Sequence, residues 1–240
     1  MPYHSARRHI GALFATAILA ACGGGDTVTP PCDCPATYNF QLGMLGLVKI
    51  GSTANVNLSG TAIVQGVSTP FTGTGALTLS PAVSGTFNGM AAMLQTQSIT
   101  GTVMAAGKSA PYSVSTVNAY DAQGDILGAS QSGEFDVAPA PIFIPTYVST
   151  MLDQLGSLTR YSDSQLSSVK GMTQLSVVVQ LIPVDPGSPE VVQLTAKVYD
   201  VNQALVETDN VSYQLTAGGS LSFNSETTQS NSGTLTVTLQ

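Results

Sequence analysis

Residues 192–199 read Val-Gln-Leu-Thr-Ala-Lys-Val-Tyr, an alternation of apolar and polar side chains. Successive side chains of a β-strand point to opposite faces, so this stretch places an apolar row on one face and a polar row on the other. The same period of two recurs in four other places: Ala54, Val56 and Leu58; Leu77 and Leu79; Val211, Tyr213 and Leu215; and Leu235, Val237 and Leu239. Such one-sided rows are typical of antiparallel sheets with one face in water. The pattern predicts an all-β fold, either an antiparallel sandwich or half-barrel-like sheets.

One stretch departs from this period. Val148, Met151, Leu152 and Leu155 fall at helical spacing, directly after Pro145. We therefore expect one short helix near 147–156. The proline-punctuated stretch before it indicates a joint, so we divide the chain into a β module over 37–140 and a second over 141–240, or a single continuous domain.

Two turn sequences resemble each other. Residues 120–127 read Tyr-Asp-Ala-Gln-Gly-Asp-Ile-Leu, and residues 199–206 read Tyr-Asp-Val-Asn-Gln-Ala-Leu-Val. A duplicated meander explains the likeness, and so does chance similarity among β sequences, because hairpin turns accept Asp, Asn and Gly for backbone reasons. Asp121 and Asp125 suggest a calcium site at first sight, but Ala204 stands where Asp125 stands, which favours turn residues.

The N-terminus has the three parts of an export signal. Arg7 and Arg8 form a basic head, an apolar run covers 10–21, and small residues close it. About a dozen apolar residues are too few to span a bilayer as a helix, which takes about 20. The run ends in Leu19-Ala20-Ala21, followed directly by Cys22.

This ending resembles the lipobox of Gram-negative bacterial lipoproteins. The resemblance implies a signal peptide over 1–21, with Leu19, Ala20 and Ala21 recognised by signal peptidase II and Cys22 carrying the lipid. Two or more acyl chains hold a protein firmly on a membrane. Gly23, rather than Asp, follows the cysteine, which implies the outer membrane and a periplasm-facing protein. The alternative is a plain secretory signal cut after Ala20 or Ala21.

Residues 22–36 read as a flexible tether rich in glycine and proline. The tether holds Cys32-Asp33-Cys34, the chain's remaining two cysteines. In an oxidising compartment they form a redox or metal site, or they are a linker thiol pair; we favour the linker pair, since two thiolates supply only half of a zinc shell.

Composition excludes several classes of function. Without residues 1–21 the chain keeps five Lys and Arg against fourteen Asp and Glu, a net charge of −9, and loses both histidines. Nucleic acid is excluded as a partner because phosphates are neutralised by clustered basic residues. Without histidine a Ser-His-Asp catalytic triad cannot form. We expect no catalytic residues, no metal and no cofactor.

Three functions remain. The first, and our expectation, is a membrane-anchored, non-catalytic envelope lipoprotein with a structural or interaction role. The second is a carrier of an apolar ligand in a curved sheet, with a methionine lining drawn from Met90, Met93, Met104, Met151 and Met172. The third is a carboxylate-based hydrolase, which requires two acids in one cleft. A protein partner or ligand is not identified by the sequence.

Overall fold

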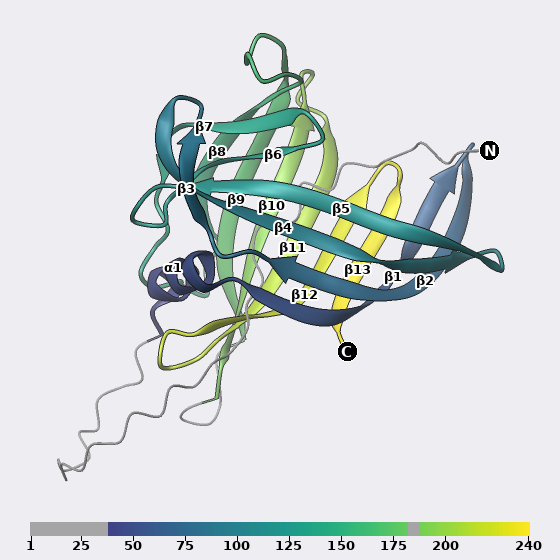
Figure 1. The fold of residues 1–240 in the computed structure, drawn as a ribbon, viewed down its shortest axis with the longest axis horizontal. Helices are drawn as coiled ribbons and strands as arrows, with labels where there is room; N and C mark the ends of the chain where they lie inside the picture. The colour runs from purple at the N-terminus through teal and green to yellow at the C-terminus, as the bar shows by residue number, and fades with distance from the viewer. Residues whose placement is uncertain (1–37, 182–187) are drawn as a thin grey trace.

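The structure, a computed structural model, describes residues 38–181 and 188–240 (Figure 1). Within these ranges one helix and thirteen strands follow one another: α1 (Phe40–Ile50), β1 (Ser52–Val64), β2 (Val67–Leu79), β3 (Val83–Phe87), β4 (Met90–Ala105), β5 (Lys108–Tyr120), β6 (Ile126–Gln131), β7 (Glu134–Ile142), β8 (Asp153–Tyr161), β9 (Val169–Leu181), β10 (Glu190–Asp200), β11 (Leu205–Leu215), β12 (Leu221–Ser230) and β13 (Gly233–Leu239). The signal peptide, the lipobox, the tether, Cys32 and Cys34 lie outside the described residues. Among those residues, no helix is long and apolar enough to cross a membrane.

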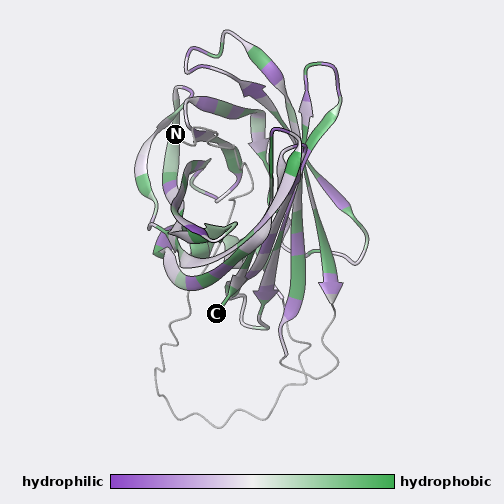
Figure 2. Ribbon diagram, turned by 90° about the vertical axis from the view of Figure 1, so that its right-hand side faces the viewer, coloured by the Kyte–Doolittle hydropathy of each residue, from purple (hydrophilic) through white to green (hydrophobic). Residues whose placement is uncertain are grey.

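All thirteen strands belong to one antiparallel sheet that closes on itself. The sixteen-residue β4 makes the closure: its first five residues pair with β3, and Gln97–Ala105 pair with β2. Twelve strands thus form a closed barrel and β3 is an extra strand on β4. Figure 2 shows the sheet curling round. The all-β prediction is confirmed. The sandwich alternative is wrong, because the sheet curls as the half-barrel alternative expects and then closes.

Glycine permits the closing pair of strands to approach. Gly75 and Gly101 are partners in the β2–β4 register. A Cβ added to Gly75 would lie 2.3 Å from the Thr100 carbonyl oxygen, and one added to Gly101 would lie 2.4 Å from the Thr74 carbonyl oxygen. Any side chain at either position would force the two backbones apart, so these glycines mark a point of strong curvature.

The period of two sorts side chains between the inside and the outside of the barrel. On β10, Val192, Leu194 and Val198 are buried while Lys197 is exposed. On β1, Val56 and Leu58 are buried and the asparagines between and before them are exposed. Because most strands repeat this arrangement, one continuous apolar core fills much of the barrel.

Helix α1 closes one end of the barrel, within the range predicted as the first β module. Its Phe40, Met44, Leu47 and Val48 are at most 1% exposed and follow helical spacing. Asn39 caps the start, accepting a 2.8 Å hydrogen bond from the Leu42 N–H. At the other end the buried Gln95 of β4 donates to the carbonyl oxygens of Leu47, Val48 and Ser80 at 3.0, 3.3 and 3.1 Å. The last helical carbonyls are thereby satisfied away from water.

The one short helix therefore lies at Phe40–Ile50, and its predicted position near 147–156 is wrong. Residues 147–152 form bends and irregular backbone, and β8 begins at Asp153, which pairs with Val177 of β9. Met151 and Leu152, two of the four apolar residues at helical spacing, are 74% and 55% exposed. Pairing along β9 overrides the local helical spacing, as tertiary contacts do for weak propensities.

Residue 140, the expected module boundary, lies inside β7. The strands before and after it join the same sheet. Whether the two ranges arose by duplication stays a prediction.

Candidate functional site

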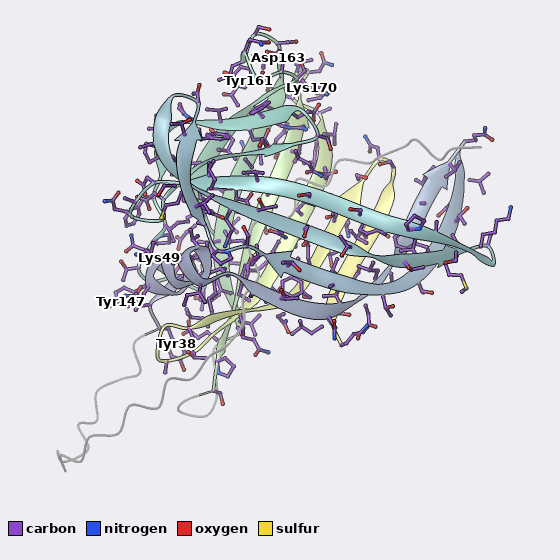
Figure 3. All side chains as sticks on the ribbon, viewed as in Figure 1. Tyr38, Lys49, Tyr147, Tyr161, Asp163 and Lys170 are labelled. Carbon is purple, nitrogen blue, oxygen red and sulfur yellow. The ribbon has the colours of Figure 1, made fainter. Side chains whose placement is uncertain are left out.

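The barrel interior becomes charged away from α1. Polar side chains on five strands share this region, and all except the partly exposed Lys170 are buried: Glu134 and Asp136 on β7, Arg160 on β8, Lys170 and Thr173 on β9, Asp209 on β11, and Glu226 and Thr228 on β12. Figure 3 places Lys170 near Tyr161 and Asp163, at the end of the molecule opposite Tyr38 and Tyr147. Charged side chains are almost never fully buried unless they are paired, so the burial of these charged residues requires an explanation.

One half of this charged interior is an ion-paired cluster. Arg160 Nη2 lies 3.5 Å from Glu134 Oε2, and Arg160 Nε lies 3.3 Å from Asp136 Oδ1. Lys170 Nζ pairs with Glu134 Oε1. Thr173 Oγ1 donates to Asp136 Oδ2 at 3.5 Å. Two cations thus face two carboxylates.

The strand register builds this cluster. Asp136 and Arg160 are direct partners in the β7–β8 ladder, and Arg160 is in turn the partner of Gly171 on β9. Cross-strand partners have Cβ atoms about 5 Å apart, which brings opposite charges into contact. Burial nevertheless raises the pKa of Asp136 to about 7, with Glu134 adding to the rise and Arg160 opposing it.

The other half of the charged interior is a pair of buried acids, Asp209 and Glu226. Asp209 is 1% exposed and Glu226 is 2% exposed, and they lie on neighbouring strands, β11 and β12. Burial raises the pKa of Asp209 to about 7; Glu226 adds to the rise, while Thr228, Glu207 and the more distant Arg160 oppose it. Burial and then the charge of Glu207 raise the pKa of Glu226 to about 8. Both carboxyls therefore keep their protons to a higher pH than an exposed carboxyl does.

Two tyrosines, Tyr112 and Tyr213, lie close enough to Glu226 for its charge to raise their pKa values. Burial raises the pKa of Tyr112 on β5, and Glu226 raises it further. Burial also raises the pKa of Tyr213 on β11, with smaller contributions from Tyr120 on β5 and from Glu226. Since β5 neighbours neither β11 nor β12 in the sheet, the interactions of Tyr112 with Glu226 and of Tyr120 with Tyr213 run across the barrel. The two walls meet through tyrosines and carboxyls.

This arrangement can store protons, but solvent has little access to it. A carboxyl pair with a pKa near neutral is the kind of group that general acids use. A substrate would have to reach it, and Asp209 and Glu226 are almost completely covered. In residues 38–181 and 188–240 no group of three or more His, Cys, Asp or Glu is arranged to hold a metal ion.

The two resembling turns have the same hydrogen bonds. In each, the Asp Oδ1 accepts from the backbone N–H groups two and four residues later, at 2.8 and 2.9 Å, for Asp121 and for Asp200 alike. Asp125 is used differently, accepting a 2.9 Å hydrogen bond from the Ile144 N–H. These aspartates are turn residues, as the sequence favours, and their hydrogen bonds lower the pKa of Asp200.

The remaining candidate residues from the sequence do not form a common site in the structure. The five methionines of the suggested ligand lining do not share a surface: Met90, Met104 and Met151 are exposed, Met172 is half-buried, and Met93 packs against the main core. Arg160, which the sequence analysis did not single out, is buried in β8. Leu19, Ala20, Ala21 and Cys22 lie outside the described residues.

A signal for the buried acids was present in the sequence. Asp209 stands two residues before Val211 and so belongs to the same inward row as Val211, Tyr213 and Leu215. Glu134 and Asp136 likewise share one face of β7 with Ala138. Extending each apolar row by one period would have identified these acids as inward-facing.

Comparisons of the chain with protein-family models, with curated proteins and with solved structures find no match. The functional argument therefore depends on the residues of this chain.

Proposed function

We propose that this chain is a lipid-anchored protein of the bacterial outer membrane, facing the periplasm, with a structural or interaction role and no catalytic activity. The observation that carries the proposal is the run Leu19-Ala20-Ala21-Cys22 at the end of a short apolar segment. An acylated Cys22 would hold a folded barrel at a membrane that the barrel itself does not have to enter.

The non-catalytic part is supported by the charged interior. The pair best suited to acid–base chemistry, Asp209 and Glu226, is almost fully covered by protein. A glycoside hydrolase of the usual kind needs two carboxyls that flank the bond to be cut, in a cleft that the sugar enters. The charged interior is better explained as a polar part of the core than as a catalytic centre.

A second candidate is a carrier, and one observation favours it. Glu226 Oε2 and Tyr112 Oη are buried and have no hydrogen-bond partner among the described residues. A small polar or cationic molecule between the barrel walls would supply partners for both atoms. This ligand differs from the apolar one that the methionines suggested. Native mass spectrometry of the protein released from membranes tests it: a bound mass lost in Glu226→Gln supports the carrier, and the bare polypeptide mass argues against it.

Fractionation of cells that express the full chain tests the anchor. Cys22→Ser should prevent acylation and remove the protein from the outer-membrane fraction. The matched control is the double variant Cys32→Ser/Cys34→Ser, which leaves the lipobox intact and should fractionate like the wild type. An unchanged distribution of Cys22→Ser would contradict the proposal.

A further inference from the structure

Five exposed apolar side chains lie on α1 and on the segment that hydrogen-bonds to its first residue. Leu42 lies on the helix, and the other four come from the segment between β7 and β8; the set, here named the helix-end surface, is Leu42, Phe143, Tyr147, Met151 and Leu152. Each is more than half exposed. Contiguous apolar side chains on the surface of a protein commonly mark a contact with a partner or a membrane.

Hydrogen bonds hold the two parts of this surface together. The Phe40 N–H donates to the Thr146 carbonyl oxygen at 2.8 Å, and Thr146 Oγ1 donates to Gln41 Oε1 at 3.2 Å. The Val179 N–H donates to the Ser149 carbonyl oxygen at 2.8 Å, which fixes the segment again further along. Figure 3 shows Tyr147 beside α1. The apolar side chains are therefore carried by a rigid part of the molecule.

We propose that the helix-end surface rests on the interface of the bilayer that holds the lipid anchor, an inference that depends on the proposed acylation of Cys22. The described chain begins at Tyr38, two residues before α1, so the anchor is attached at this end of the barrel. Fifteen residues, 23–37, separate Cys22 from Tyr38. A flexible chain of that length spans roughly 20 Å on average.

The composition of the helix-end surface fits a membrane interface. Tyr147 has an apolar ring and a polar hydroxyl, the combination that is enriched where hydrocarbon meets water. Leu42, Met151 and Leu152 supply the aliphatic area that becomes covered.

The opposite end of the barrel provides a natural control. The β1–β2 and β4–β5 turns also expose apolar side chains, namely Ile63, Val64, Val67 and Met104. These are aliphatic only, and β1 leads to them through 13 residues, about 40 Å of strand. If the anchor decides which end meets the bilayer, this end should stay in water.

Tryptophan fluorescence distinguishes the two ends, because the chain has no tryptophan of its own. The full chain is expressed as Tyr147→Trp and, separately, as Val67→Trp. Each acylated protein is purified from membranes and placed in vesicles of phosphatidylethanolamine and phosphatidylglycerol with brominated acyl chains. We expect Tyr147→Trp to lose most of its emission to bromine quenching and Val67→Trp to lose almost none. Phe143→Trp serves as a second probe if Tyr147→Trp does not fold.

A pair of polar substitutions tests whether the surface itself makes the contact. Met151→Ser/Leu152→Ser in the Tyr147→Trp background should reduce quenching strongly, whereas Val64→Ser/Val67→Ser in the same background should leave it unchanged. Acylated protein that floats with vesicles but shows no quenching at Tyr147→Trp, or equal quenching at both ends, overturns this inference alone. If the purified full chain carries no acyl chains and does not float with vesicles, the proposed function and this inference are both overturned.

Discussion

The two regions of the barrel interior are stabilised in different ways. Near α1 the interior is largely apolar, and the buried amide of Gln95 satisfies carbonyl oxygens at the end of the helix. Between β7 and β12 the interior contains Glu134, Asp136, Arg160, Asp209 and Glu226, all buried. The difference teaches that a closed sheet can bury charge as well as hydrocarbon, provided that the charge is paired or removed by protonation.

The largest effect is expected from breaking the ion-paired cluster. Arg160→Leu removes the guanidinium that lies between Glu134 and Asp136, leaving buried carboxylates without it. We expect the free energy of unfolding at pH 8 to fall by about 3–5 kcal/mol. Urea unfolding measures it. At pH 5 the loss should be smaller because Asp136, whose pKa is raised to about 7, is then protonated, and a loss of equal size at both pH values would contradict this account.

The matching change in the apolar region is Leu47→Ala. Leu47 is fully buried against the barrel core, so its truncation should cost about 2–5 kcal/mol, from lost transfer energy and the cavity left behind. Unlike Arg160→Leu, this loss should be the same at pH 5 and pH 8. A pH-dependent loss would show that the two regions are not separate.

The wild-type protein should become less stable as the pH rises from 4 to 8. Asp136, Asp209 and Glu226 have raised pKa values, about 7, 7 and 8, so the folded chain keeps protons that the unfolded chain releases near pH 4. Their contribution is complete below pH 4 and is lost as the pH passes through 7 and 8.

Glu226→Gln sharpens this point. The neutral amide cannot ionise, so the variant should be about 1–3 kcal/mol more stable than the wild type at pH 8 and should show a flatter pH dependence. Thermal unfolding at a series of pH values measures both. A variant that is destabilised at pH 8 would mean that the carboxylate form of Glu226 is the stabilising one.

The smallest effect is expected outside the barrel interior. Asp121→Ala and Asp200→Ala each remove two hydrogen bonds from an exposed turn, so both should lower Tm slightly and by similar amounts. The lowered pKa of Asp200 gives it the opposite pH dependence to that of Glu226, since its contribution is lost as the pH falls. Clearly unequal changes in Tm would show that the two turns are not equivalent.

The sequence predicted what depends on local pattern and missed what depends on strand partners. The rows at Val192–Val198 and Val211–Leu215 were correctly assigned to strands because the period of two is local. Closure was not predictable, since it depends on β2 meeting β4 across the sheet. Helix α1 was missed because its stretch contains Gly43 and Gly46, which disfavour helices.

The charged interior was missed for a similar reason. Arg160 follows a segment that has helical spacing but forms bends and a strand. Its position opposite Asp136 becomes apparent only when β7 and β8 are paired. An isolated Arg in sequence is usually a surface residue, and only the register shows that this one is buried.

Intact-mass spectrometry of the protein extracted from membranes tests the central claim most directly. The account predicts a polypeptide that begins at Cys22 and carries the added mass of a diacylglyceryl group and an amide-linked acyl chain. An unmodified polypeptide, or one that begins at another residue, would contradict it.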